Sequence, residues 1–397
     1  MPEPAPILIA GGGIGGLVLA LALAKTGRAS IVLEQRDSFG AAGAGIQLGP
    51  NGVRVLQRLG LAEALRPAVG VPDALAVHDG RSGRALAVLP LGRWIAARHG
   101  APYWVVHRGD LHAILAAAAA AQPRITLRTS FTLASLAQKG EDLQARSAAG
   151  EVATGGALVG ADGLWSSVRR AVAPAHVPEL VGATAARTVI PVAAAGRLAL
   201  PAVGLWLSPG VNVVHYPVRG GSEIAAVVIA TETWQGAGWE TKADKEALIA
   251  QLRGFHASLA EPLAMAPEWR KWALHRLAPL PRWSAGRVTL IGDAAHPMLP
   301  HLAQGGVLAL EDAVVLADAL AAYPGNEAQA FAVFETQRRR RAARVQTMSR
   351  INGRIYHARP PLSWARDAML RAVPGTWLMA GYDWLYGWRA DARKMDA

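Results

Sequence analysis

The chain has 397 residues, of which 52% are hydrophobic and 18% are charged, and 42 are glycine. This composition is typical of a globular protein with two or three domains and argues against a disordered chain. There is no cysteine, so disulfides, thiolate metal sites and iron–sulfur clusters are excluded, we expect no metal site, and redox chemistry would need a bound cofactor.

The net charge of +12 is compatible with a nucleic-acid partner, but most of the arginines are scattered along the chain. The one run, Arg338 to Arg341, lies in a helical stretch, where we expect a solvent-exposed face. Glycines interrupt the apolar stretch from Ile7 to Ala24, which therefore predicts a strand and a helix rather than a membrane span. Because no secretory signal is evident, we expect a cytoplasmic protein with no nucleic-acid or membrane partner.

The first elements in the chain form a strand–turn–helix–strand unit. Residues 7–10 predict a buried strand, 17–25 a helix and 30–34 the next strand. The turn contains the pattern G-x-G-x-x-G, and side chains at these glycines would keep a pyrophosphate from the helix N-terminus that attracts it.

A carboxylate about 20 residues after this turn can accept hydrogen bonds from ribose hydroxyls, and it would repel the 2′-phosphate of NADP. The unit therefore predicts an adenine-dinucleotide site for either NAD or FAD, the alternative being a turn that is merely tight. The predicted cofactor-binding residues of this unit are Gly11, Gly13, Ile14, Gly15, Gly16 and Glu34.

The middle of the chain predicts mixed elements. Helices are expected at 50–59 and at 111–121, where an alanine run favours helix strongly. Short strands with turns at Gly140 and Gly150 indicate a small meander, and residues 157–160 predict another buried strand.

The pattern changes between about residues 181 and 276. Alternating strands at 211–218 and 224–230, and one helix at about 245–259, predict a second, sheet-based domain.

Beyond this region the first type of pattern returns. Residues 288–291 predict a buried strand and 306–320 a helix, so the first sheet is expected to combine segments that are far apart in the sequence. The chain then reads as helical from about 324 to 357 and breaks at Pro360-Pro361. The tryptophan-rich stretch at 377–388 is interpreted as a packing extension.

Two more motifs follow buried strands: Asp162-Gly163, with Ser166 and Arg169, and Gly292-Asp293. In this order, and together with the N-terminal glycines, they resemble the group A flavoprotein hydroxylases, the family with the 4-hydroxybenzoate hydroxylase fold. Further segments are similar to the branch that contains salicylate hydroxylase and 6-hydroxynicotinate 3-monooxygenase. These segments are Gly43-Ala44-Gly45-Ile46-Gln47, His107 to His112, Met298 to Gly305 and Trp384 to Trp388.

The resemblance implies bound FAD, with NADH or NADPH as a transient co-substrate, since no second dinucleotide motif is evident. It implies that Asp293 binds flavin ribityl or ribose hydroxyls, that Arg108 contacts FAD, and that Asp162 serves the pyrophosphate. The alternatives are a helix N-cap for Asp162 and a surface ion pair for Arg108. Gly305 and Gly306 are expected at the start of a helix, whose N–H groups would stabilise negative charge on reduced flavin. The alternative is that these glycines only begin the helix and have no role in binding.

The activity that the resemblance implies is hydroxylation of a small aromatic hydroxy acid with O2, through a flavin C4a-hydroperoxide. The acid is expected to be either salicylate-like or a hydroxypyridine carboxylate. The ring carbon is nucleophilic enough only when its hydroxyl group is ionised or strongly hydrogen-bonded, so we expect a base near the substrate. His301 is the first candidate, because it lies between the G-D motif and the glycine helix start; a structural loop histidine is the alternative. His215 and Tyr216 follow, and because strand neighbours point to opposite faces, we expect only one to face the substrate. His296 is expected to support its loop.

Two departures from the family pattern concern the substrate. Gln47, counted among the cofactor-binding residues, stands where the 6-hydroxynicotinate enzymes have histidine, which favours a benzenoid hydroxy acid. Ala186-Arg187 replaces the Trp-Arg of many relatives, which would enlarge the pocket. Arg187 is expected to pair either with a substrate carboxylate or with a neighbouring acid.

The predicted fold class is α/β: a Rossmann-like FAD-binding domain with an inserted β-sheet substrate domain and a C-terminal helical extension. The ranges are 1–72, 101–178 and 280–325 for the FAD-binding domain, 73–100 and 179–279 for the substrate domain, and 326–397 for the extension. Three other functions stay open: a flavin monooxygenase for a larger tailoring substrate, a flavin reductase without oxygen insertion, and, more distantly, a nucleic-acid-binding protein. Either a monomer or a homodimer is compatible with the sequence.

Overall fold

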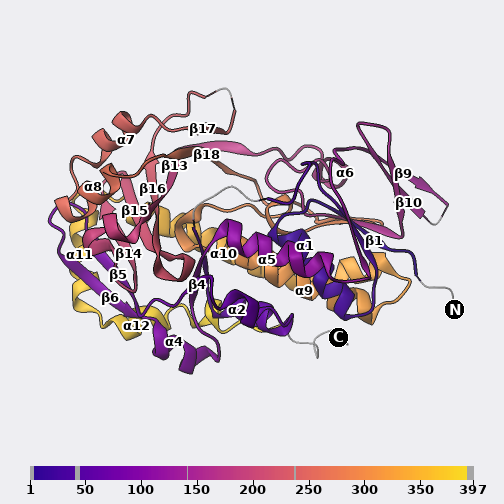
Figure 1. The fold of residues 1–397 in the computed structure, drawn as a ribbon, viewed down its shortest axis with the longest axis horizontal. Helices are drawn as coiled ribbons and strands as arrows, with labels where there is room; N and C mark the ends of the chain where they lie inside the picture. Colours follow the sequence, from indigo (N-terminus) through magenta and orange to yellow (C-terminus); the bar gives the residue numbers. More distant parts are fainter. Residues whose placement is uncertain (1–3, 41–44, 141, 237, 391–397) are drawn as a thin grey trace.

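The computed structural model describes residues 4–40, 45–140, 142–236 and 238–390, so Gly43 and Ala44 of the similar segments lie outside the described residues. The predicted α/β architecture is confirmed. A parallel sheet flanked by helices lies at one end of the elongated molecule, and a large, mostly antiparallel sheet lies at the other (Figure 1).

The parallel sheet is assembled from distant parts of the chain. Its strands, in spatial order, are β19 (Ser284–Ala285), β20 (Val288–Leu290), β12 (Ala157–Gly160), β1 (Ile7–Ala10), β2 (Ser30–Leu33) and β8 (Ile125–Arg128). Only β19 runs antiparallel to its neighbour. Every residue of β1 and β12 is buried, as expected for apolar strands covered on both faces.

Three helices pack side by side below this sheet in Figure 1: α1 (Ile14–Lys25), α5 (Arg108–Ala120) and α9 (Gly305–Ala322). Helix α1 begins three residues earlier than predicted, because the glycine turn itself enters the helix. Helices α2 (Pro50–Arg58) and α10 (Glu327–Tyr356) pack against α9.

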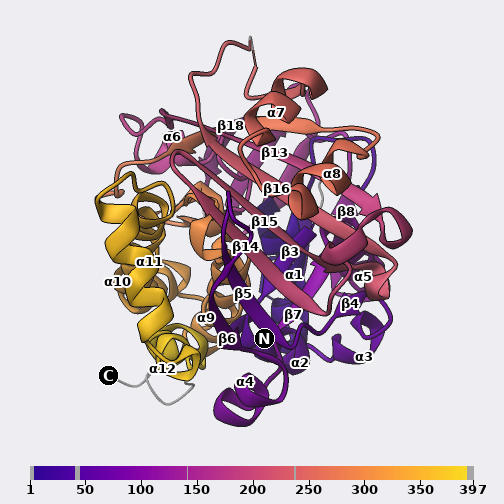
Figure 2. The same ribbon diagram turned by 90° about the vertical axis from the view of Figure 1, so that its left-hand side faces the viewer.

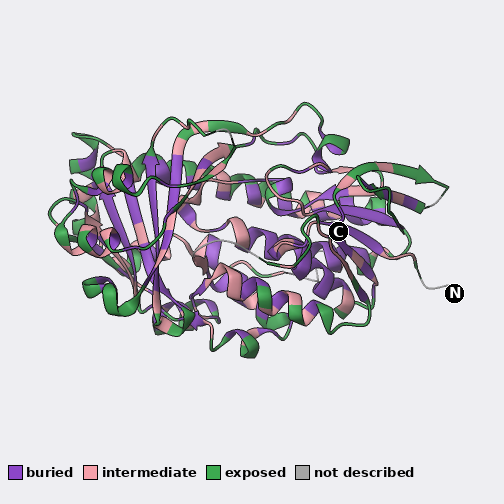
Figure 3. Ribbon diagram, turned by 45° about the horizontal axis from the view of Figure 1, so that its top comes forward, coloured by how far each residue is buried: buried purple, intermediate pink, exposed green. Residues whose placement is uncertain are grey.

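The large sheet has eight strands. In spatial order they are β17 (Glu240–Lys242), β18 (Arg270–Arg276), β13 (Glu179–Pro191), β16 (Glu223–Thr231), β15 (Val211–Val218), β14 (Ala202–Ser208), β5 (Ala74–Asp79) and β6 (Ala85–Pro90). One face turns toward the parallel-sheet part of the molecule and shares its core, and the other face packs a separate apolar core under two helices (Figure 3).

Those two helices correct one prediction. Residues 245–259 were expected to form one helix, but the structure has α7 (Lys245–Leu252) and α8 (Ala257–Ala264). The chain breaks at Gly254, and the side chain of His256 accepts a hydrogen bond from the Ser258 N–H, which caps the new helix.

The remaining elements are short. The strands are β3 (Gly45–Leu48), β7 (Trp104–His107) and β4 (Val69–Gly70), which form one sheet, and the predicted meander β9 (Leu133–Lys139), β10 (Asp142–Ser147) and β11 (Val152–Gly155). The helices are α3 (Ala62–Leu65), α4 (Gly92–His99), α6 (Arg169–Val172), α11 (Leu362–Ala372), α12 (Gly375–Ala380) and α13 (Asp383–Tyr386). Single 3-10 turns lie at Val192–Ala194, Gly196–Leu198, Arg219–Gly221, Gly292–Ala294 and Pro300–Leu302.

The arginine run on α10 also differs from its prediction. Arg338 is buried between Glu311 and Asp312 of α9, and Arg341 pairs with Glu311. Residues three apart on a helix share a face, so these two guanidinium groups turn toward α9. Only the two arginines between them are exposed to solvent, as predicted.

Candidate active site

The glycine turn after β1 contains two glycines that the fold itself requires. A Cβ on Gly16 would lie 2.0 Å from the carbonyl oxygen of Gly11. Gly11 has a φ of +106°, and its Cβ would lie 2.5 Å from the carbonyl oxygen of Ala161. These two positions allow β1, α1 and the loop after β12 to meet.

Gly13 is different, because a Cβ there would meet no protein atom within 4 Å, and its φ of −74° suits any residue. Helix α1 begins here with no side-chain cap and no acidic residue in its first turn, so its N–H groups and positive dipole end stay available. A recess adjoins this turn. It is lined by Gly12, Gly13, Glu34, Arg36, Ser38, Phe39, Gly40, Arg108 and His112. An uncapped helix start, a bare glycine and nearby arginines fit a pyrophosphate.

The carboxylate of Glu34 lies directly at this turn. One oxygen accepts a hydrogen bond from the Gly12 N–H at 2.8 Å, and the other accepts one from the Arg36 N–H at 3.0 Å. His112, whose role the sequence did not predict, bonds through Nε2 to the Gly12 carbonyl oxygen at 2.7 Å. Burial lowers the pKa of His112, so the neutral ring donates this bond and fixes the turn.

The D-G motif and the G-D motif are tied together by Arg169. Its guanidinium donates to the carbonyl oxygens of Leu164 and Ala294, at 2.6 and 3.0 Å. Asp162 accepts from the N–H groups of Ser167 and Val168 in the loop before α6, but the N-cap position of α6 is Val168, so Asp162 is not its N-cap residue. The second oxygen of Asp162 has no hydrogen-bond partner among the described residues.

Asp293 lies in the G-D turn, close to the start of α9. Its side chain is exposed to solvent, yet the surrounding protein desolvates it enough to raise the pKa of this carboxyl group, and nearby His296 and Arg108 oppose the rise. A Cβ on Gly305 would lie 3.9 Å from Asp293 Oδ1, so the start of α9 lies beside this carboxyl group. Arg108 lines the recess at Gly13 and also lies within electrostatic range of Asp293.

A buried ionic network holds the G-D turn onto α9. Asp312 accepts from the Gly292 N–H at 2.9 Å, from His296 Nε2 at 2.5 Å and from Arg338 Nε at 2.7 Å. Burial alone would raise the pKa of Asp312, but His296 and Arg338 hold it well below its usual value. His296 supports its loop through this bond.

A second arm of the network fixes the start of α9. The Asn51 amide group bonds Gln304, the residue before α9, at 3.0 Å and Glu311 at 2.7 Å. Glu311 also pairs with Arg338 and Arg341. None of these roles was predicted, although adjacent acids in an apolar helix, followed by an arginine run, are a signal for such pairing.

On the large sheet, Tyr216 faces the parallel-sheet part of the molecule. A Cβ on Gly45 would lie 2.2 Å from its ring. Burial raises the pKa of Tyr216 to about 12, opposed by Arg187 and by a hydrogen bond with Gln47, so the phenol stays neutral. Gln47 also accepts a hydrogen bond from the Tyr103 hydroxyl at 2.7 Å.

His215 lies on the opposite face of the strand. A Cβ on Gly204 would lie 2.0 Å from its Nε2, and its ring centroid is 6.4 Å from that of Trp206, in the core beneath α7 and α8. Burial, with a smaller contribution from His78, lowers the pKa of His215 to about 3. Of the two neighbours, only Tyr216 faces the recess side.

Arg187 of β13 has no acidic partner among the described residues. Its guanidinium lies 5.2 Å from the ring centroid of Trp272, and no described residue forms an ion pair with it. Its Nε has no hydrogen-bond partner among the described residues, and burial lowers the pKa of the group. Arg108 and Tyr216 lie within its electrostatic reach. Of the two partners expected for Arg187, a neighbouring acid is therefore absent from the described residues.

His301 sits against the end of α10. A Cβ on Gly353 would lie 2.6 Å from the His301 ring, and Tyr356 and His357 meet it edge-on with centroids 5.9 and 5.6 Å away. His357 in turn bonds Asn212 Oδ1 at 2.8 Å. Burial lowers the pKa of His301 to about 4, so the ring is neutral near pH 7, and its Nδ1 has no partner among the described residues.

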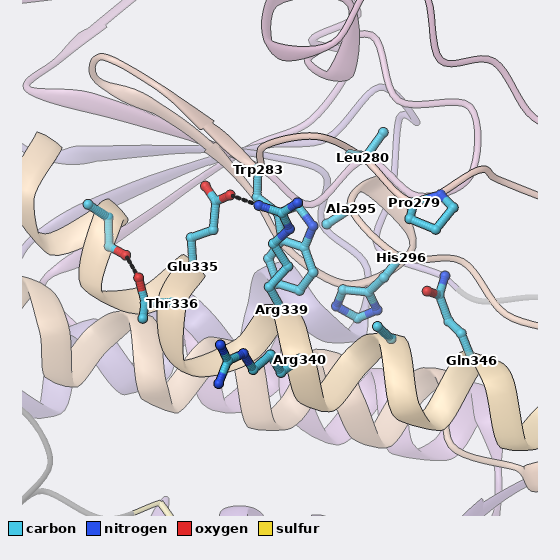
Figure 4. A pocket seen from close by; sticks show the side chains of 12 residues that line it. Pro279, Leu280, Trp283, Ala295, His296, Glu335, Thr336, Arg339, Arg340 and Gln346 are labelled. Atoms are coloured by element: carbon cyan, nitrogen blue, oxygen red, sulfur yellow. Dashed lines mark hydrogen bonds and ion pairs between the residues drawn. The ribbon is translucent and has the colours of Figure 1, made fainter.

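A larger cavity, of about 730 Å³, lies behind the G-D turn, between α10 and the segment before β19 (Figure 4). Trp283, His296 and Arg339 are among its lining residues. None of the predicted catalytic or cofactor-binding residues lines it.

Comparisons with known proteins identify the family of the chain. The FAD binding domain family matches residues 4–350. The chain is 35% identical over 385 residues to 3-hydroxybenzoate 6-hydroxylase of Klebsiella oxytoca, covering 97% of both proteins. It is 35% identical over 352 residues to 6-hydroxynicotinate 3-monooxygenase of Bordetella bronchiseptica, covering 87% of this chain and 91% of that protein. A solved salicylate hydroxylase substrate complex superposes with a TM-score of 0.83 at 26% identity, covering 100% of this chain and 98% of that one.

Proposed function

The chain belongs to the FAD binding domain family and, within it, to the group A aromatic hydroxylases, and from this premise we propose that its substrate is a small hydroxybenzoate. It is an FAD-dependent aromatic-ring monooxygenase. We further propose that NADH or NADPH and O2 are its co-substrates, and that it acts in the cytoplasm as a monomer or homodimer.

The described residues fit FAD. Gly13 and the uncapped start of α1 would receive the pyrophosphate, Glu34 the ribose, and Asp293 the ribityl hydroxyls, with Arg108 between them. The start of α9 would lie beside the flavin ring. When bound and reduced, FAD activates O2 and supplies one oxygen atom to the substrate ring.

The observation that carries the substrate class is the unpaired cation of Arg187. A buried guanidinium is stabilised most by a carboxylate that it can bind through two hydrogen bonds. The Trp272 ring already lies against one side of the guanidinium, and the carboxylate of a bound aromatic acid would supply the missing ion pair. An amide or a neutral ring of the same shape would leave the charge unpaired.

The proposed proton acceptor is His301. It is neutral near pH 7, its Nδ1 is unpartnered, and its ring is fixed by the end of α10. Accepting the proton of the substrate hydroxyl group would make the ring more nucleophilic. We propose that Tyr216, rather than His215, is the residue of β15 that contacts the substrate. Its neutral phenol, together with Gln47, can orient the substrate by hydrogen bonds.

The benzenoid ring is favoured over a pyridine ring for two reasons. Gln47 is an amide and cannot serve as a base, and Tyr103 already donates to its oxygen. Relatives such as the Klebsiella oxytoca enzyme are named for hydroxybenzoate substrates.

A panel of ring compounds tests the proposal. Substrate-stimulated NAD(P)H oxidation and product mass are measured for salicylate, 3-hydroxybenzoate, 4-hydroxybenzoate and 6-hydroxynicotinate. Each acid is compared with its carboxamide, and a set of bulky neutral aromatic compounds is measured beside them. At least one hydroxybenzoate should stimulate oxidation and gain one oxygen atom, and its carboxamide should not. A response to bulky neutral aromatics alone would indicate a larger tailoring substrate, and oxidation without any oxygenated product would indicate a reductase.

A further inference from the structure

Large apolar side chains protrude from the outer side of the C-terminal helices. We call this the apolar–basic face; its apolar members are Val88, Ile351, Ile355, Leu362, Trp364, Met369 and Trp377. The two tryptophans are 68% and 74% exposed and Leu362 is 71% exposed, although such residues are normally turned inward. Exposed apolar side chains that gather on neighbouring elements of a protein mark an interaction surface.

The members of the face lie on elements that touch one another. Arg366 of α11 donates from Nη1 to the carbonyl oxygens of Ile355 and Tyr356, both at 3.0 Å, which anchors α11 to the end of α10. A Cβ on Gly375 at the start of α12 would lie 1.9 Å from the carbonyl oxygen of Val88 in β6. Figure 2 shows α10, α11 and α12 stacked along one side of the molecule.

In helix α11, polar side chains are buried and apolar side chains are exposed, which is the opposite of an ordinary surface helix. Ser363 and Arg366 are buried, whereas Leu362, Trp364 and Met369 are exposed. A helix with this pattern packs its polar side on the protein and presents its apolar side outward.

The segment that carries most of the face is strongly basic. Between Arg338 and Tyr382 the sequence has ten arginines, and its only acidic residue is Asp367, which is bonded to Arg366. Arg350, Arg354, Arg359 and Arg371 are exposed between or beside the apolar members. A second copy of the chain would bring these exposed guanidinium groups close to one another, and the acid of this segment, Asp367, is already bonded to Arg366.

We propose that the apolar–basic face docks on an anionic lipid bilayer. Exposed tryptophans suit the interfacial depth of a membrane, and arginines at the same level bind acidic headgroups while the leucine and methionine enter the acyl boundary. The contact is a surface attachment, since no helix within residues 4–390, apart from the undescribed positions, is long and apolar enough to cross a membrane. It is independent of which ring compound the enzyme hydroxylates.

The test is sedimentation of the FAD-loaded full chain with vesicles of phosphatidylcholine alone or of phosphatidylcholine mixed with phosphatidylglycerol. Binding is expected only to the mixed vesicles, and added salt should weaken it because the headgroup contacts are screened. The double variant Trp364→Ser/Trp377→Ser should lose roughly tenfold or more of the binding. Arg354→Gln and Arg371→Gln should each lose about fivefold. Trp239→Ser, which removes an exposed tryptophan outside the face, is the matched control and should bind normally.

Flavin content and melting temperature of each variant verify that it is folded. The proposal is overturned if neither vesicle binds the protein, or if both bind it equally. It is also overturned if sedimentation equilibrium without lipid shows a dimer that the double tryptophan variant dissociates, since the face would then be a contact between copies.

Discussion

Replacing Arg187 by methionine tests whether this cation recognises the substrate carboxylate. Methionine keeps an unbranched, apolar stem against Trp272 but removes the charge. Because no described acid pairs with Arg187, and burial already disfavours its charged form, the free energy of unfolding should stay the same or rise slightly. Substrate affinity should respond in the opposite direction.

The size of that response follows from the lost charge-assisted hydrogen bonds. Such bonds contribute about 1.5–3 kcal/mol when one partner is charged. A loss of about 2–3 kcal/mol corresponds to a dissociation constant roughly 30- to 150-fold higher for the acid. The carboxamide of the same ring, which cannot form the ion pair, should bind the variant and the parent with affinities within about threefold of each other.

Ligand titrations that follow the flavin absorption spectrum measure both dissociation constants, and thermal unfolding measures stability. Arg253→Met is the matched control, because Arg253 is an exposed arginine of the same sheet domain, at the end of α7. An unchanged dissociation constant for every hydroxybenzoate in Arg187→Met would refute the assigned role.

Three other perturbations address the remaining parts of the site. Gly13→Ala should leave the apoprotein as stable as the parent, since a Cβ there meets no protein atom. The same change should lower FAD affinity at least roughly tenfold, because the methyl group would occupy the place of the pyrophosphate. The flavin retained per chain measures this, and full retention would contradict a pyrophosphate contact. His301→Ala should keep FAD yet slow hydroxylation by about 10²- to 10⁴-fold, and unchanged turnover would remove His301 from the mechanism. His215 has its pKa lowered to about 3, so the unfolded chain binds a proton near pH 6.5 that the folded chain does not bind until near pH 3. Stability should therefore fall as the pH drops through this window, by up to about 1.4 kcal/mol per pH unit for this group; denaturant unfolding of His215→Asn should show a shallower dependence, and an identical slope would count against it.

The nucleotide-binding half of the site was predictable because its signals are local. The turn at Gly11, Gly13 and Gly16 lies between a strand and a helix with clear sequence patterns, and Glu34 directly follows the next strand. Glycine positions report backbone geometry directly, so a short motif indicates the fold around it. The return of the buried-strand pattern at residues 288–291 then predicted that segments far apart in the sequence join in one sheet.

The features that escaped prediction depend on partners far apart in the chain. The Asp312–Arg338 pair joins two helices, and nothing local shows that an arginine in a basic run turns inward. The side of β15 that faces the flavin region was likewise undetermined, since both His215 and Tyr216 are buried and alternation gives no absolute direction. Trp377 in α12 is exposed, so the packing role expected for it was wrong. Its burial depends on whether another element covers that face of the helix, which the local sequence does not show.

The central claim is that one recess holds the flavin and an aromatic acid, with the acid on Arg187 and its hydroxyl group near His301. A crystal structure of the FAD-loaded protein with bound 3-hydroxybenzoate measures this directly. The account predicts pyrophosphate density at Gly13, the flavin ring beside Gly305 and Gly306, and the carboxylate within hydrogen-bond distance of Arg187. A carboxylate bound elsewhere, or a substrate ring that does not reach the flavin, would contradict it.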